Sequence, residues 1–310
     1  MKSYLNNLLN IGSGCKLLLL AMALLLACKK EQPSVPSSEW QGSGLEVFVD
    51  YEPLAAKNLR LFYFVPANAN ATSPIVFIFH GAERNALEYR NAIINKATAM
   101  NFIVVVPEFS EASFSDVNGY QLGNVYIDGD QPSAATLNAE AIWSFSLVEP
   151  LFAFVKNKTK NTNATYLAIG HSGGAQFLHR FLMFKPAAKC ERAIVSAAGW
   201  YTATDKNIDF PYGLRSSPLE SLDLAPLYTK NITVQVGTSD NNPNSSSLRR
   251  NAQADAQGLH RLARAQYFYN KAAQNASILS LPFTWQLAII PGLSHDYVAA
   301  LGHAADLLFP

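Results

Sequence analysis

A serine in a glycine-rich stretch is the first residue of this chain whose setting suggests chemistry. Ser172 lies between Gly170 and Gly174 in the sequence "AIGHSGGAQ", residues 168–176. A serine hydroxyl is a weak nucleophile until a neighbouring base removes its proton. Nucleophilic catalysis therefore also needs a base, an acid that orients the base, and hydrogen-bond donors for an oxyanion. The alternative is a glycine-rich turn that contains a serine by chance.

The residues on either side of Ser172 favour the nucleophile. Residues 165–170 are apolar and predict a buried strand, and an amphipathic helix is predicted from Gly174. A G-x-S-x-G sequence at such a turn lifts the serine hydroxyl above the sheet, and the helix N-terminus offers N–H groups to an anion. We expect the backbone N–H of Gly173, the next residue, to be one oxyanion donor.

The base is predicted to be His295. It lies in "PGLSHD", residues 291–296, between the last predicted strand and the last predicted helix. A histidine in a loop at that place can reach over the edge of the sheet. The other histidines end a strand, lie beside Ser172 or fall in helical patterns: His80, His171, His179, His260 and His303.

The acid is predicted to be Asp240, which follows a buried strand in "ITVQVGTSDNNP". An aspartate in such a sequence is also an ordinary turn residue. Three competing acids do not directly follow a strand: Asp205, Asp209 and Asp223.

The second oxyanion donor should come from the loop after the third strand, in "FHGAERN", residues 79–85. The backbone N–H of Ala82 is our prediction. The alternative is that Gly81 simply ends a strand.

Strand and helix patterns alternate along most of the chain. Strands are predicted at 45–52, 59–66, 74–81, 102–109, 165–170, 192–199, 232–237 and 284–290. Helices are predicted at 86–100, 141–156, 174–184, 256–273 and 296–308. The first two strands should pair antiparallel, and the rest predict an eight-stranded, mostly parallel sheet flanked by helices. Two long loops, 110–138 and 200–230, should lie at the carboxyl edge, where such sheets bind ligands.

Aromatic residues in or near these loops could line a substrate pocket: Trp143, Trp200 and Tyr201. They could equally be packing beneath the loops. Arg249 and Arg250 could bind a substrate carboxylate or form a solvated charge pair.

The N-terminus resembles that of an exported bacterial lipoprotein. Residues 17–27 form a short apolar run after Lys16, and "LLAC" places Cys28 where a lipid would be attached. We expect a signal peptide at 1–27, a lipidated Cys28 with a flexible tether at 28–44, and one sizeable α/β domain at 45–310. The protein should then be anchored to the bacterial cell envelope, with the outer membrane favoured.

Composition narrows the classes of partner. The chain has 24 Lys and Arg against 23 Asp and Glu, so nothing suggests a nucleic-acid surface. No Cys, His and carboxylate cluster has metal-ligand spacing, and no cofactor motif is present, so we expect neither. Cys190 is the one cysteine of the predicted domain and is expected to be a buried filler.

The order Ser172, Asp240, His295 is the α/β-hydrolase order. The chain resembles α/β-hydrolases of the esterase and poly(3-hydroxyalkanoate) depolymerase-like kind, and a bacterial subgroup of secreted hydrolases most of all. The resemblance covers most of residues 58–308 and is carried by "HG..RN...YR" from His80, "VPEFS" (106–110), "Y.LGNV" (120–125), "GHS.GAQF.HR" (170–180), "AGWYT" (198–202), "FPYGL" (210–214) and "LRR" (248–250).

The resemblance implies that triad and an ester-like substrate. Where the family often has "DTDP", this chain keeps Asp240 and has Asn242, which puts a second carboxylate in doubt. The expected function is hydrolysis of a carboxylic ester through an acyl-enzyme. The alternatives are a serine peptidase or amidase with the same triad, and a non-catalytic binding lipoprotein that kept the fold.

Overall fold

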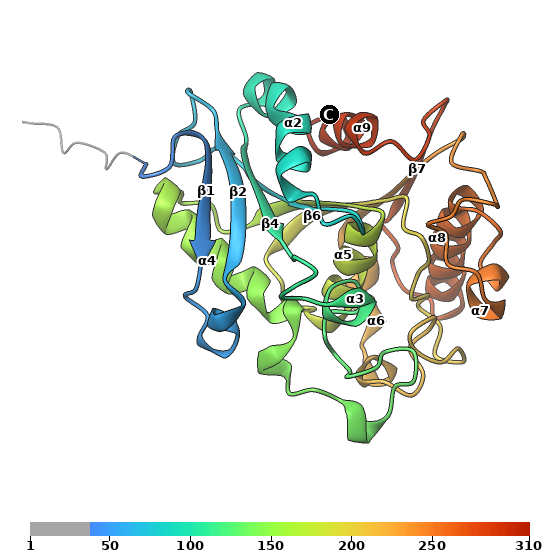
Figure 1. Ribbon diagram of the computed structural model, residues 1–310. Helices are drawn as coiled ribbons and strands as arrows, with labels where there is room; N and C mark the ends of the chain where they lie inside the picture. Colours follow the sequence, from blue (N-terminus) through green and yellow to red (C-terminus); the bar gives the residue numbers. More distant parts are fainter. Residues whose placement is uncertain (1–37) are drawn as a thin grey trace, which may run out of the picture. The chain divides into compact units, whose positions relative to one another are not determined.

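One eight-stranded sheet organises the part of the chain that the computed structural model describes, residues 38–310 (Figure 1). Its strands are β1 (Gly42–Phe48), β2 (Leu59–Val65), β3 (Ile75–Phe79), β4 (Ile103–Glu108), β5 (Tyr166–His171), β6 (Cys190–Ser196), β7 (Asn231–Gly237) and β8 (Gln286–Ile290). Their order across the sheet is β1-β2-β4-β3-β5-β6-β7-β8. β1, β2 and β4 pair antiparallel, and every pair from β4 to β8 is parallel. The predicted mostly parallel sheet is confirmed.

Helices cover both faces of this sheet. The α-helices of residues 38–310 are α2 (Ala86–Met100), α3 (Asp116–Gly119), α4 (Val148–Thr159), α5 (Gly173–Phe184), α6 (Leu224–Tyr228), α7 (Ala252–Ala256), α8 (Arg261–Ile278) and α9 (Tyr297–Leu308). α2 and α9 lie on one face, where Ile93 and Leu301 join one apolar cluster. α4, α5 and α8 lie on the other, where Phe177 and Phe268 join a second cluster (Figure 1). β3 and β5 are buried between the two layers, which explains why their sequences are apolar throughout.

The folded domain begins earlier than the predicted boundary at residue 45. β1 starts at Gly42, and Trp40 is buried with its ring stacked on Tyr63 at 4.0 Å between centroids. The Trp40 indole N–H also donates to the Glu46 carboxylate at 2.8 Å. The sequence did not indicate this start because residues 38–44 are mostly polar or glycine. Such a composition is compatible with a strand at the edge of the sheet, where about half of the side chains are exposed. The predicted signal peptide and Cys28 lie outside the described residues.

Two predicted helices have different boundaries in the structure. Residues 140–147 form two short 3-10 turns before α4, whose first turn accommodates Pro150. α8 begins at Arg261 because Gly258 adopts a φ of +135° and the His260 ring caps the helix by accepting from the Ala263 N–H. Within residues 38–310, no helix combines the length and apolarity needed to cross a membrane.

α5 approaches the ends of β3 and β5 so closely that only glycine fits. A Cβ on Gly174 would overlap the carbonyl of Phe79 at the end of β3. A Cβ on Gly170 would overlap the carbonyl of Gly174. These two glycines therefore set the distance between the helix and the sheet.

We predict that Gly174→Ala destabilises the protein by about 3 kcal/mol, because backbone rather than a flexible side chain would have to move. Gly302→Ala on α9 is the matched control: the nearest atom to its Cβ would be the Lys96 Cε at 4.0 Å. That change should be neutral or stabilise by up to about 1 kcal/mol through helix propensity. The measurement is the urea midpoint of unfolding, and equal midpoints for the two variants would contradict the packing argument.

Candidate active site

Ser172 lies at the turn between β5 and α5 in a strained backbone conformation. Its φ is 54° and its ψ is −114°, a region that residues with a side chain seldom adopt. The backbone N–H donates to the Ser196 carbonyl at 2.9 Å, which ties the turn to β6. The side chain does not cap the helix. Its hydroxyl is half-buried and free to bond elsewhere.

The structure brings Ser172, His295 and Asp240 together in one hydrogen-bonded chain. The His295 Nε2 lies 3.1 Å from the Ser172 Oγ, and the His295 Nδ1 lies 2.7 Å from an Asp240 carboxylate oxygen. The Asp240 side chain is 5% exposed and the imidazole 26%. The carboxylate is therefore shielded from water, while the imidazole and the serine remain within reach of a ligand.

The loops that carry Asp240 and His295 are joined to each other. The Gly292 N–H donates to the Thr238 hydroxyl at 2.8 Å, and the Ser239 N–H donates to the Leu293 carbonyl at 3.0 Å. Because β7 and β8 are adjacent and parallel, their following loops leave the same edge of the sheet. Asp240 and His295 are thereby held in register by hydrogen bonds between the two loops.

Arg261, at the start of α8, was not predicted from the sequence. Its guanidinium lies 3.5 Å from the other Asp240 carboxylate oxygen, and its side chain is buried. Burial lowers the pKa of Arg261, and the Asp240 carboxylate acts in the opposite direction. The buried Asp240 carboxylate thus has two partners, the Arg261 guanidinium and the His295 ring. An arginine in the first turn of a helix carries no local signal of such a contact.

The competing residues have other roles. Asp205 pairs with Lys271, Asp209 with Arg215, and Asp223 caps α6. His179 accepts from the Thr202 N–H, while His303 is exposed on α9. His171 packs its ring 4.8 Å from that of His295 and bonds the Tyr89 hydroxyl. Burial, followed by His295 and Arg261, lowers the pKa of His171, so this ring stays neutral beside the base.

The backbone of Gly173, the residue after Ser172, lies beside the backbone nitrogen of Ala82. The Ala82 nitrogen lies 3.0 Å from the point where a Cβ on Gly173 would be. Both groups were predicted as oxyanion donors, and the loop after β3 brings them together. The Gln121 side-chain nitrogen lies 3.3 Å from the same point, a neighbour that sequence reasoning missed because it comes from the long loop 110–138.

His80 orients the peptide that carries the Ala82 N–H. Its Nδ1 bonds the Gly81 carbonyl at 2.9 Å, and its Nε2 accepts from the Phe109 N–H at 3.1 Å. The ring is therefore a neutral tautomer with Nδ1 as the donor. Because the peptide is trans, a carbonyl held toward His80 directs the Ala82 N–H the opposite way.

The predicted aromatic pocket is a packing cluster for two of its three members. Trp143 donates its indole N–H to the Asn138 carbonyl and packs edge-on against Phe184. Tyr201 is fully buried and stacks on Phe268 at 4.5 Å. Both support the long loops, and burial explains why residue type alone could not assign them. Trp200 is also buried, but it lies beside two arginines.

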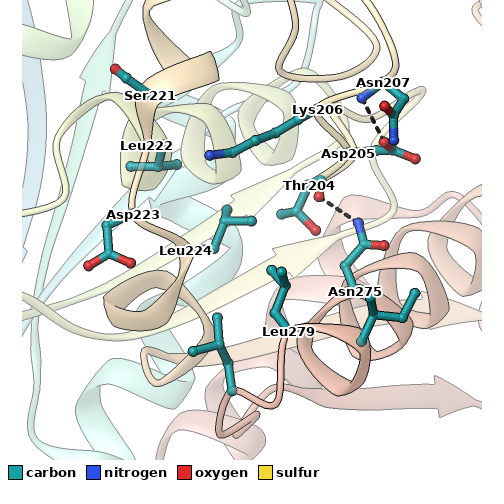
Figure 2. A pocket seen from close by; sticks show the side chains of 12 residues that line it. Thr204, Asp205, Lys206, Asn207, Ser221, Leu222, Asp223, Leu224, Asn275 and Leu279 are labelled. Carbon is teal, nitrogen blue, oxygen red and sulfur yellow. Dashed lines mark hydrogen bonds between the residues drawn. The ribbon is translucent and has the colours of Figure 1, made fainter.

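A cavity of about 620 Å³ lies elsewhere on the molecule (Figure 2). It is formed by residues 204–207, 221–224 and 275–281, and Figure 2 shows the Asn275 amide bonded to the Thr204 carbonyl. It contains none of the predicted site residues. This cavity is thus separate from the hydrogen-bonded group of Ser172, His295 and Asp240.

Within residues 38–310, no group of three or more His, Cys, Asp or Glu side chains could hold a metal ion. Cys190 is buried, and burial raises the pKa of its thiol to about 12. It is therefore protonated and unreactive at neutral pH.

Solved structures of other proteins share this fold, although no family model and no curated protein matches the chain. Poly(aspartic acid) hydrolase-1 from Sphingomonas sp. KT-1 is 35% identical, with a TM-score of 0.80 over 87% of this chain and 99% of its own. The chain belongs to the α/β-hydrolases. LpqC, a poly(3-hydroxybutyrate) depolymerase from Bordetella parapertussis, is 28% identical, with a TM-score of 0.79 over 87% of this chain and 90% of its own. An S-formylglutathione hydrolase from Agrobacterium tumefaciens shares the fold at 15% identity, with a TM-score of 0.51 over 86% and 92% of the two chains. The protein is a hydrolase enzyme of the depolymerase and esterase-like kind.

We predict that this hydrolase loses stability in mild acid, in part through His80. Burial lowers the pKa of His80 to about 4, whereas the unfolded side chain titrates near its ordinary 6.5. The unfolded state therefore binds a proton first as the pH falls, so the loss begins near pH 6.5 and is complete below pH 4. At pH 5 this group alone should remove about 2 kcal/mol of unfolding free energy.

The measurement is urea unfolding at pH 7.5 and pH 5 for wild type and His80→Gln, which cannot titrate. His171 and His179 remain in both proteins, so the difference between the two losses isolates His80. The exposed His303→Gln is the control and should lose as much as wild type. An equal loss for His80→Gln and wild type would rule the assignment out.

Proposed function

We propose that this protein is a serine hydrolase that cleaves carboxylic esters through an acyl-enzyme on Ser172. The observation that carries the proposal is the chain of hydrogen bonds from Ser172 through His295 to Asp240. Its setting adds support, because the N–H groups of Gly173 and Ala82 lie beside the serine.

The first half of the reaction forms the acyl-enzyme. His295 Nε2 takes the Ser172 proton as the Oγ bonds to the ester carbonyl carbon. The negative charge that develops on the carbonyl oxygen is stabilised by the Gly173 and Ala82 N–H groups. The tetrahedral intermediate collapses, the C–O bond to the alcohol breaks, and His295 gives its proton to the leaving oxygen.

The second half repeats these steps with water. His295 removes a proton from water, the hydroxide adds to the acyl carbon, and the Ser172 Oγ leaves with the proton that His295 returns. Asp240 stays ionised throughout and orients the imidazole, and its charge favours the imidazolium form. Arg261 acts through Asp240 as a positioning residue.

Short or polymeric esters are the substrate class that we favour. The named depolymerase neighbour acts on a polyester, and that likeness supports the proposal by analogy. A specific observation also favours a second candidate, amide hydrolysis. The neighbour with 35% identity is named for poly(aspartic acid), whose residues are joined by amide bonds. The same triad attacks either carbonyl.

We further propose that Cys28 is lipidated after removal of residues 1–27, and that the protein is anchored to the bacterial envelope. The support is the sequence "LLAC" after a short apolar run. A tethered hydrolase of this kind would meet substrates outside the cytoplasm.

Ser172→Ala should reduce the kcat/KM for 4-nitrophenyl esters by at least about 10³-fold, because the nucleophile is removed while the donors remain. The measurement is hydrolysis of a 4-nitrophenyl ester series by residues 29–310. Ser294→Ala is the matched control: it is exposed, next to His295, and should retain activity. A wild type that cleaves 4-nitroanilides but no ester would favour the amidase. Equal inactivity of wild type and Ser172→Ala toward both would leave a non-catalytic binding protein.

Cys28→Ala should abolish incorporation of a palmitate analogue and move the full-length protein from the membrane to the soluble fraction. The measurement is metabolic labelling in a bacterial host, followed by fractionation. Cys15→Ala is the matched control, because it lies within the predicted signal peptide and should still be labelled at Cys28. Equal labelling of Cys28→Ala and wild type would refute the anchor.

A further inference from the structure

Arg180 is a buried cation without a carboxylate partner. It lies on α5, two turns after Ser172, and its side chain is fully buried. Among residues 38–310, no acidic group is within salt-bridge distance of it, and its Nη2 has no hydrogen-bond partner. Its other contacts are the Thr202 hydroxyl and the backbone carbonyls of Gln121 and Gln176. A buried charge left in this state is unfavourable, so a role for it must be sought.

Hydrogen bonds link the Arg180 guanidinium to residues near Ser172. Its Nη1 reaches back along the helix to the Gln176 carbonyl, one turn from Ser172. The Gln121 carbonyl that accepts from the same nitrogen belongs to the residue whose side chain reaches Gly173. The amide oxygens of Gln121 and Gln176 are themselves buried and unpaired. These two oxygens are acceptors, so within this group the Arg180 Nη2 is the unpaired donor that an anion could use.

A second arginine, Arg249, lies nearer the surface and contacts the same tryptophan, Trp200. The Arg180 guanidinium lies 4.1 Å from the centre of the Trp200 ring, and that of Arg249 lies 4.8 Å from it. Arg249 is partly exposed and bonds the Asp130 carboxylate at 2.5 Å. Burial lowers the pKa of Arg180, Arg249 lowers it further, and the Asp130 carboxylate acts in the opposite direction. Asp130 thus acts on both arginines, although it bonds only one.

Buried hydrogen bonds hold the backbone near Trp200 and Arg249. Gln257 bonds both the N–H and the carbonyl of Tyr201, which fixes the backbone beside Trp200. Arg264 donates to the backbone carbonyls of Gly199 and Arg249. The Asp130 side chain, in contrast, is 47% exposed on the long loop 110–138. It is the member of the cluster most easily replaced.

We propose that Arg180 and Arg249, stacked on Trp200, form an anion subsite that binds a carboxylate of the substrate. In the free enzyme the Asp130 carboxylate bonds Arg249, and the carboxylate of the substrate displaces Asp130 from this bond. This inference rests on the proposed function, since it names the substrate class of the Ser172 site: carbonyl compounds that carry a second, ionised carboxyl group a few bonds from the scissile carbonyl. A planar guanidinium binds carboxylate with two parallel hydrogen bonds, which suits this task better than a lysine.

The test compares 4-nitrophenyl monoesters of adipic, pimelic and suberic acid with the same esters methylated at the far carboxyl. The readout is the ratio of kcat/KM for the charged ester to that for its neutral match, after subtraction of spontaneous hydrolysis. Wild type should prefer the charged ester by about tenfold or more at one chain length, the size expected for a charge-assisted hydrogen bond. Added KCl should reduce that preference.

Variants of opposite sign make the test specific. Arg249→Gln should bring the ratio close to one, and Arg180→Lys should lower it, whereas Asp130→Asn should raise it above that of wild type. Arg250→Gln is the matched control, because this neighbouring arginine pairs with Asp255, and its ratio should equal that of wild type. If Asp130→Asn lowers the ratio, or Arg249→Gln leaves it unchanged, the subsite is refuted.

A binding measurement separates this inference from the proposed function. Calorimetric titration of Ser172→Ala with monomethyl suberate needs no turnover, and Ser172→Ala/Arg249→Gln should bind about tenfold more weakly. If wild type hydrolyses neutral esters with no charged preference at any length, the subsite fails and the hydrolase assignment stands. If no ester is cleaved, the titration alone decides: equal affinities of the two proteins, or no binding by either, would overturn the subsite.

Discussion

The close approach of α5 to the ends of β3 and β5 is the constraint on which the site depends. Gly170 and Gly174 leave no room for a side chain between helix and sheet. Because the helix starts so near the strand, the single residue at the turn must adopt a positive φ, and that residue is Ser172. The same approach places Gly173 beside the Ala82 N–H. The proposed nucleophile and oxyanion donors are thus products of one packing contact.

The rest of the triad depends on a second constraint, the burial of a carboxylate. A buried Asp240 is tolerated only with partners, and the structure supplies two, His295 and Arg261. Hydrogen bonds between the β7 and β8 loops hold it opposite the base. The imidazole therefore lies between the Asp240 carboxylate on one side and the Ser172 hydroxyl on the other.

The residues that sequence reasoning found are those with local signals. The eight strands were readable because each is an apolar or alternating run, and Ser172 because its glycines surround it at a strand end. Asp240 and His295 follow from chain order once the turn at Ser172 is recognised. Arg261 and Gln121 were missed because their contacts join segments far apart in sequence. The same reason hid the burial of Trp143 and the start of the domain near Trp40, since packing partners cannot be read from one segment.

Two buried arginines, Arg180 and Arg264, differ in how their charge is balanced. Arg264 is as deeply buried as Arg180, but it pairs with Asp255 and donates to three backbone carbonyls. Its role is therefore to hold the surrounding loops together. Within residues 38–310, Arg180 has three neutral acceptors and one unpaired nitrogen. A fold that can supply a carboxylate to one buried arginine could supply it to the other. That residues 38–310 leave Arg180 without one, two helix turns beyond Ser172, is best explained if the missing carboxylate arrives with the substrate.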